Sequence, residues 1–183
     1  VDQIQSKHKI AWCIESPAIK SHFSNHIHLV ENKFDYIYTY TPKSDNQKYK
    51  QSYFGACWIV EENCKIYEKT KLLSIVASNK NYAPGHKLRH EIISKNLHKN
   101  LELWGSGYKW FSDEPEDRLK PFKDYMYVIV VENCKHPNYF TDKIIDCFAS
   151  GCIPIYWGDP NIDQHFNGNG FYKWNTIEDL TKI

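Results

Sequence analysis

The chain has 183 residues, 42% of them hydrophobic and 25% charged, which is the composition of a globular protein that can bury a core. The 23 Lys and Arg residues almost balance the 22 Asp and Glu residues, so the cationic surplus typical of nucleic-acid binding is absent. No apolar stretch approaches the ~18 residues that span a membrane and no signal peptide is visible, so we expect a cytoplasmic protein whose six separated cysteines are reduced.

The N-terminal part is predicted to contain two strands, at 9–14 and 35–40. The first strand runs into "ESP" (15–17), where Pro17 stiffens the turn that carries Glu15. A carboxylate held in this way is either a general base that projects into a cleft or a cap of the turn. Composition does not choose between these two roles.

Less regular segments complete this part of the chain. A histidine-rich stretch lies between the strands, and we interpret it as a polar helix face rather than a metal site: His22, His26 and His28. A polar loop is expected at 41–52, and a domain boundary near 62–71. We therefore divide the chain into a short domain at 1–66 and a larger one at 67–183.

From residue 72 onward, strand and helix patterns alternate. Strands are predicted at 72–78, 101–105, 125–131 and 152–158, and helices at about 85–97, 115–123 and 141–150. Several of these strands are continuous apolar runs, which indicates that both of their faces are covered. The alternation predicts an α/β domain built on a parallel, doubly wound sheet.

One of these helices has an unexpected first turn. Thr141 is its predicted N-cap and Gly151 its end, yet Lys143 lies where the helix dipole disfavours a cation by about 0.3–1 kcal/mol. An anion must therefore lie close to this lysine. The neighbouring Asp142 and a bound phosphate are the two candidates.

Ligands of open parallel sheets bind beyond the carboxyl ends of the strands. Three predicted loops follow such ends: 78–91, 132–143 and 158–164. If the first two loops are neighbours, Arg89 and Lys143 converge with two helix N-termini, and this arrangement suits a diphosphate. The alternatives are that Arg89 is a surface partner of Glu91 and that Lys143 is a solvated lysine beside Asp142. P-loop, GxGxxG, HExxH, DxD and paired CxxC motifs are all absent from the sequence.

The segment "YVIVVENCKHPNYFTDKIIDCFASGCIPIYWG" (127–158) resembles the signature of the family 10 glycosyltransferases, the α-1,3/4-fucosyltransferases. The matching positions are Glu132, Asn133, Tyr139, Thr141, Asp142, Lys143 and the run from Gly151 to Gly158. Upstream, "VASNKNYAPGHKLRHE" resembles the S-N…R segment of the family, with Ser78, Asn79 and Arg89 in place. "IESPAIKSH" is similar to its acceptor-side glutamate loop.

The resemblance implies a GT-B-like α/β fold of two Rossmann-like parallel-sheet domains, the N-terminal one being short. It implies a GDP-fucose donor, a glycan acceptor and an inverting single displacement with Glu15 as the base. By analogy Arg89 and Lys143 hold the diphosphate, Asp142 meets the ribose although it is shorter than the usual glutamate, and Asn133 and Tyr139 line the nucleotide pocket. The donor-binding set is completed by Ser78, Asn79, Glu132 and Thr141.

No metal site or cofactor is required by this resemblance, and stimulation by a divalent cation is compatible with it. No membrane anchor is visible in these 183 residues, so we expect the sequence to be nearer the bacterial or viral relatives of the family. Two other functions stay open: a GT-B transferase that uses another nucleotide sugar, and a non-catalytic remnant that binds a nucleotide sugar or a glycan.

Overall fold

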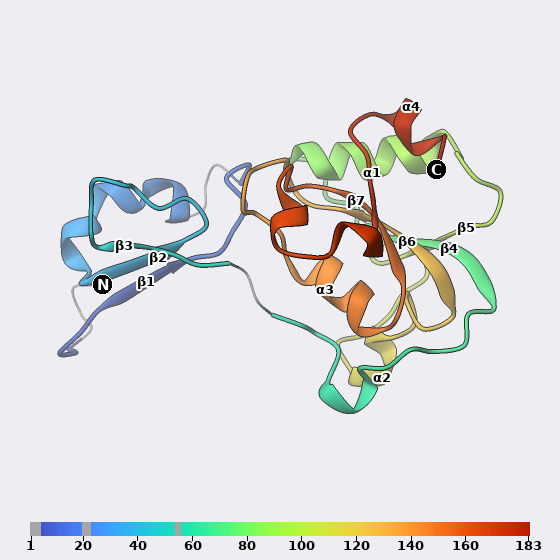
Figure 1. Cartoon of the computed structure of the whole chain (residues 1–183), viewed down its shortest axis with the longest axis horizontal. Helices are drawn as coiled ribbons and strands as arrows, with labels where there is room; N and C mark the ends of the chain where they lie inside the picture. Colours follow the sequence, from blue (N-terminus) through green and yellow to red (C-terminus); the bar gives the residue numbers. More distant parts are fainter. Residues whose placement is uncertain (1–4, 20–22, 54–55) are drawn as a thin grey trace.

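The computed structural model describes residues 5–19, 23–53 and 56–183, so His22 lies outside the described residues. The polypeptide forms two parallel sheets, one in each of two units that lie side by side (Figure 1). Within the described ranges, no helix has the length and apolar character needed to cross a bilayer.

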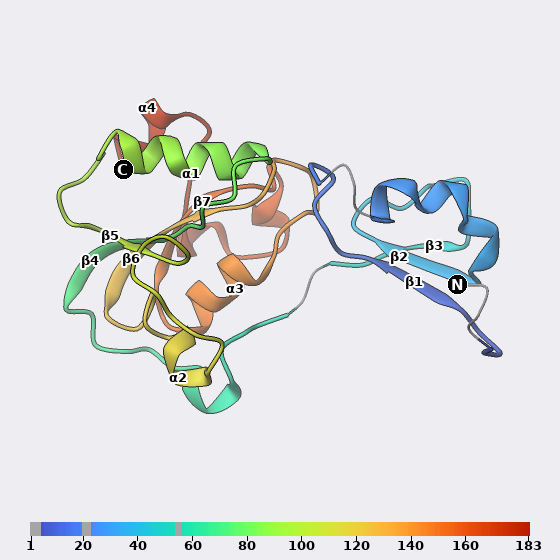
Figure 2. The ribbon, with the colours of Figure 1, turned by 180° about the vertical axis from the view of Figure 1, so that it is seen from behind.

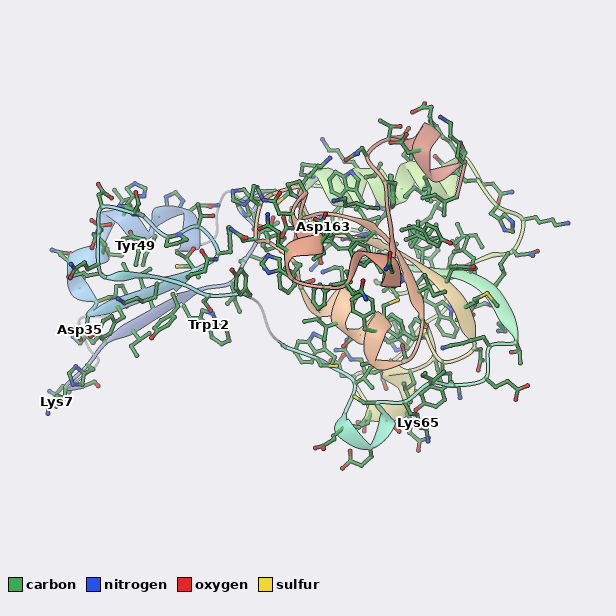
Figure 3. The ribbon with its side chains drawn as sticks, viewed as in Figure 1. Lys7, Trp12, Asp35, Tyr49, Lys65 and Asp163 are labelled. Carbon is green, nitrogen blue, oxygen red and sulfur yellow. The ribbon has the colours of Figure 1, made fainter. Side chains whose placement is uncertain are left out.

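The N-terminal unit is a three-stranded parallel sheet in the order β1-β2-β3. Its elements are β1 (Ile10–Cys13), β2 (Tyr36–Thr39), β3 (Tyr49–Gln51) and the 3-10 helices η1 (Phe23–Leu29) and η2 (Glu31–Lys33). Alternate strand residues such as Ile37 face the 3-10 helices and are buried, whereas Trp12 projects from the opposite face and is 58% exposed (Figure 3). The two predicted strands are confirmed, but β3 forms inside the segment 41–52 that we expected to be a loop.

The C-terminal unit contains five parallel strands in the order β5-β4-β6-β7-β8. The strands are β4 (Lys71–Val76), β5 (Leu101–Trp104), β6 (Tyr125–Val131), β7 (Ile153–Trp157) and β8 (Tyr172–Lys173). The helices are α1 (Pro84–Ser94), α2 (Pro115–Arg118), α3 (Asp142–Ala149) and α4 (Ile177–Leu180), with the 3-10 turns η3 (Glu61–Asn63), η4 (Ile162–Gln164) and η5 (Gly168–Gly170). The predicted alternation is confirmed, although α1 and α2 end earlier than expected.

The two faces of β6 show why this strand is apolar throughout. Val128 and Val130 pack into a core with α3, while Ile129 and Val131 pack into a second core with α1 and α4. Helix α1 therefore covers one face of the sheet and α3 the other, as Figure 2 shows from behind. A strand covered on both faces has no polar side to display, and this confirms the expectation from its continuous apolar run.

The strand order reverses between β4 and β6. From β4 the chain passes through β5 on one side and returns to β6 on the other side, so β4 and β6 are neighbours whose connections leave in opposite directions. Such a reversal opens a crevice at the carboxyl ends of the two strands. The two loops that were predicted to carry Arg89 and Lys143 both face this crevice.

The segment between the sheets contacts the C-terminal unit. Ile59 belongs to the core beneath α3, and the Trp58 backbone N–H donates to Asp146 Oδ1 of α3 at 2.8 Å. The three-stranded sheet ends at residue 51 and the five-stranded sheet begins at residue 71. The division at residues 66 and 67 stays a prediction.

Candidate donor-binding site

Helix α1 starts in direct contact with the end of β6. Gly85 lies in its first turn, and its N–H donates to the Asn133 carbonyl at 2.9 Å. A Cβ at this position would come within 1.7 Å of the Glu132 carbonyl oxygen, so only glycine allows the approach. The first turn of α1 is thereby fixed against the loop that follows β6.

Arg89 lies one turn further along α1 and is 5% exposed. Its Nε and Nη2 donate to the Val131 carbonyl at 3.1 and 2.5 Å, and Nη2 also donates to Asn133 Oδ1 at 3.2 Å. Burial lowers the pKa of the guanidinium, and the charge of Glu132 opposes this effect. Glu91, the alternative surface partner, instead pairs with Lys95 at 2.7 Å.

The anion beside Lys143 is Glu132. Lys143 Nζ lies 3.4 Å from Glu132 Oε2 and donates to Thr141 Oγ1 at 2.9 Å. Thr141 in turn donates its backbone N–H to Glu132 Oε1 at 2.9 Å and its hydroxyl to Oε2 at 2.8 Å. Neither Asp142 nor a phosphate is needed to explain the lysine, because a fully buried carboxylate at the end of β6 supplies the opposite charge.

Thr141 and Gly151 bound α3 as predicted. The Thr141 side chain accepts the Lys143 N–H, and Gly151 adopts a φ of +69° just after the helix.

A cavity of about 370 Å³ joins the predicted cations. Six of the ten predicted site residues line it: Glu15, Ser78, Arg89, Asn133, Asp142 and Lys143. Two cations and the first turns of α1 and α3 therefore border a single cavity. A guanidinium and an ammonium, together with the positive end of the α3 dipole, form a site suited to an anion with several oxygens.

The other four predicted residues do not line this cavity. Asn79 is exposed and does not line the cavity, although Ser78 and Lys80 on either side of it do. Glu132 and Thr141 are buried in the network that positions Lys143.

Tyr139 is 2% exposed and packs edge-to-face on Tyr40 with ring centroids 5.3 Å apart. Burial raises the pKa of its hydroxyl. Tyr139 therefore does not line this cavity, because its ring fills the junction between the two units, and its contact with the nucleotide stays a prediction.

Glu15 reaches the cavity from the N-terminal unit. It follows β1 and is half-buried, and its Oε1 accepts the Ser16 N–H at 2.7 Å. Its backbone carbonyl accepts the Tyr40 hydroxyl at 3.1 Å, and the Ser16 hydroxyl donates to Cys134 Sγ of the C-terminal unit at 3.2 Å. The carboxylate caps the turn and also lines the cavity, and its role as a general base stays a prediction.

Sequence reasoning missed several wall residues, among them His86, Lys80 and Asp146. His86 is spaced three residues before Arg89 in a helix pattern, which places both side chains on one helix face and was the available signal. In the described ranges, no group of three or more His, Cys, Asp or Glu side chains is arranged to hold a metal ion.

Comparison with known proteins identifies the relatives of this chain. The family model described as glycosyltransferase family 10 (fucosyltransferase), C-terminal part, matches residues 66–183. An alpha-(1,3)-fucosyltransferase, FucT, of Helicobacter pylori is 28% identical over 132 residues, which cover 72% of this chain and 27% of the relative.

Solved structures resemble the fold. A crystal structure of an alpha1,3-fucosyltransferase with GDP aligns with a TM-score of 0.64 at 18% identity, covering 94% of this chain and 61% of that one. A second, with GDP-fucose, aligns with a TM-score of 0.61 at 19% identity, covering 94% of this chain and 60% of that one. The expected α/β fold with Rossmann-like parallel sheets is confirmed, and the chain spans about three fifths of these structures.

Proposed function

Because the chain belongs to glycosyltransferase family 10, the fucosyltransferase family, we propose that it transfers L-fucose from GDP-fucose to a hydroxyl of a glycan acceptor. The solved relatives bind GDP and GDP-fucose, and these ligands suggest the donor. The chain spans only 27% of the Helicobacter pylori relative, so the acceptor and the linkage are left unspecified in the proposal.

The observation that carries the proposal is the shared cavity of Arg89, Lys143 and Glu15. The arginine and the lysine come from separate crossover helices, and the glutamate comes from the other unit. A transferase that uses a nucleotide diphosphate sugar needs cations at the diphosphate and a base beside the sugar. These three side chains supply that combination around one cavity.

The reaction that fits these positions is an inverting single displacement. Glu15 takes the proton from the acceptor hydroxyl while that oxygen attacks the anomeric carbon of fucose. The bond between the anomeric carbon and the phosphate oxygen breaks, and GDP leaves with the negative charge. Arg89, Lys143 and the helix N-termini stabilise this developing charge.

The proposal requires no cofactor, because the positive groups that face the diphosphate belong to the chain. Asp142 lines the cavity at the start of α3 and is the residue that we assign to the ribose. Ser78 and Asn133 complete the assigned contacts with the donor.

Titration of GDP, UDP, ADP and CMP into the purified chain by calorimetry tests this function. We expect binding of GDP with an affinity at least tenfold above that of the other nucleotides. Lys143→Ala should remove most of that affinity, whereas Lys173→Ala is a matched control because Lys173 pairs with Asp163 on the exposed surface. Preference for another base would favour the alternative nucleotide-sugar transferase. GDP binding without fucosyl transfer to any glycan would favour the non-catalytic remnant.

A further inference from the structure

His86 is held in one orientation by its surroundings. It is 4% exposed in the first turn of α1, and its Nδ1 accepts the Ala83 N–H at 3.2 Å. The ring of Tyr82 packs edge-to-face on the imidazole with centroids 4.6 Å apart. An acceptor at Nδ1 requires that the proton of the neutral ring is on Nε2.

The other nitrogen of this ring, Nε2, has no hydrogen-bond partner among the described residues. Among the described residues, Asp159 Oδ2 is the only deeply buried side-chain oxygen or nitrogen without a hydrogen-bond partner. Because the unpartnered His86 Nε2 is not among these deeply buried atoms, it is not sealed in the core. His86 lines the cavity beside Arg89 and Lys143, which is where its Nε2–H is available to a ligand.

Burial and the surrounding charges keep the imidazole neutral. Burial is the larger cause, and together with the positive charges of Arg89, Lys80 and Lys143 it lowers the pKa of His86 to about 4. At neutral pH the ring is therefore an N–H donor rather than a third cation. A neutral donor adds a directed hydrogen bond to an anion without adding repulsion between cations in the unliganded cavity.

On these grounds, and resting on the proposed function, we propose that His86 donates its Nε2–H to a diphosphate oxygen of the bound GDP-sugar. Arg89 lies one turn further along the same face of α1, so both side chains meet the same anion. The hydrogen bond strengthens as negative charge develops on the departing GDP, and His86 thereby assists the loss of the leaving group.

A purely structural role is the alternative, since the Nδ1 contact with Ala83 caps the start of α1. Two amide variants separate these roles because each reproduces one nitrogen of the ring. His86→Asn places an oxygen near the position of Nδ1 and nothing at Nε2. His86→Gln places an N–H donor near Nε2 and loses the contact with Ala83.

The test measures the affinities for GDP and guanosine by calorimetry, together with the Tm of each variant. We expect His86→Asn to weaken GDP binding about tenfold or more, as for loss of a hydrogen bond to a charged group, with guanosine binding unchanged. We expect His86→Gln to stay within about threefold of the original affinity for GDP.

The control is His98→Asn, because His98 Nδ1 also accepts a backbone N–H, that of Asn100 at 3.1 Å, but His98 does not line this cavity. This variant should bind GDP normally. Normal GDP binding by His86→Asn would overturn the inference. So would weaker GDP binding by His86→Gln but not by His86→Asn, or a loss of guanosine affinity in His86→Asn equal to its loss of GDP affinity. If the unmodified chain binds no GDP, the proposed function falls and this inference falls with it.

Discussion

Asp146 gives a prediction whose size follows from its surroundings. It is 4% exposed on α3, and its Oδ1 accepts the Trp58 N–H at 2.8 Å and the Cys57 thiol at 3.3 Å. Burial raises the pKa of this carboxyl from 3.8 to about 6, although both hydrogen bonds oppose the rise. One pKa unit corresponds to about 1.4 kcal/mol, so the ionised carboxylate costs the folded protein about 3 kcal/mol at neutral pH.

The sign of the pH dependence follows from proton binding. Between about pH 4 and pH 6 the folded protein keeps the Asp146 proton while the unfolded chain loses it. Stability therefore falls as the pH rises through this window. Asp146→Asn keeps an oxygen for the Trp58 N–H and carries no charge at any pH. We expect the variant to be more stable than the original by up to about 3 kcal/mol at pH 7.5, and nearly equal to it at pH 4.

Urea unfolding followed by tryptophan fluorescence at pH 4, 5, 6 and 7.5 measures this difference. Asp163→Asn is a useful control, because Lys173 holds the pKa of the exposed Asp163 carboxyl below its usual value, and its small effect must have the opposite sign. A gap between Asp146→Asn and the original chain that does not change with pH would refute the reasoning. A gap that favours the original chain at pH 7.5 would also refute it.

Three further predictions concern the proposed reaction. Arg89→Lys should weaken GDP binding about tenfold or more in calorimetry, because an ammonium cannot hold the Val131 carbonyl and face the ligand together; unchanged affinity would remove Arg89 from the donor site. Glu15→Gln should lower the transfer rate about 10²–10⁴-fold and leave the Kd for GDP unchanged, and a near-normal rate would exclude Glu15 as the base. EDTA treatment should leave at least half of the transfer rate, since the proposal assigns the diphosphate to Arg89 and Lys143, and complete loss that Mg²⁺ restores would contradict it.

The long strands and helices could be predicted because many consecutive residues specify each of them, so no single residue decides the outcome. β6 was recognised to the residue because seven consecutive positions suit a strand that is covered on both faces. By contrast, β3 and β8 have three and two residues and no apolar run. These two strands form because they pair with the exposed edges of β2 and β7. A short window of sequence does not show which strand edges are available for pairing.

The candidate site was predictable to a similar extent. Arg89 and Lys143 were placed together because topology brings the carboxyl ends of neighbouring strands to one crevice. The partner of Lys143 was not found, because Glu132 reads as a polar residue in a loop and its complete burial depends on packing between β6 and α3. His86 was overlooked for a related reason, since only the fold shows that its ring faces the cavity.

The buried glutamate also explains how a lysine is accommodated in the first turn of α3. Glu132 brings its negative charge to the positive end of the helix and accepts two hydrogen bonds from Thr141. A fully buried carboxylate needs a cation nearby, and Lys143 supplies it while its own side chain stays 31% exposed. Each charge therefore makes the other one tolerable. The result is an ammonium that is ordered at the cavity wall before any ligand arrives, so a diphosphate does not have to restrict a mobile lysine when it binds.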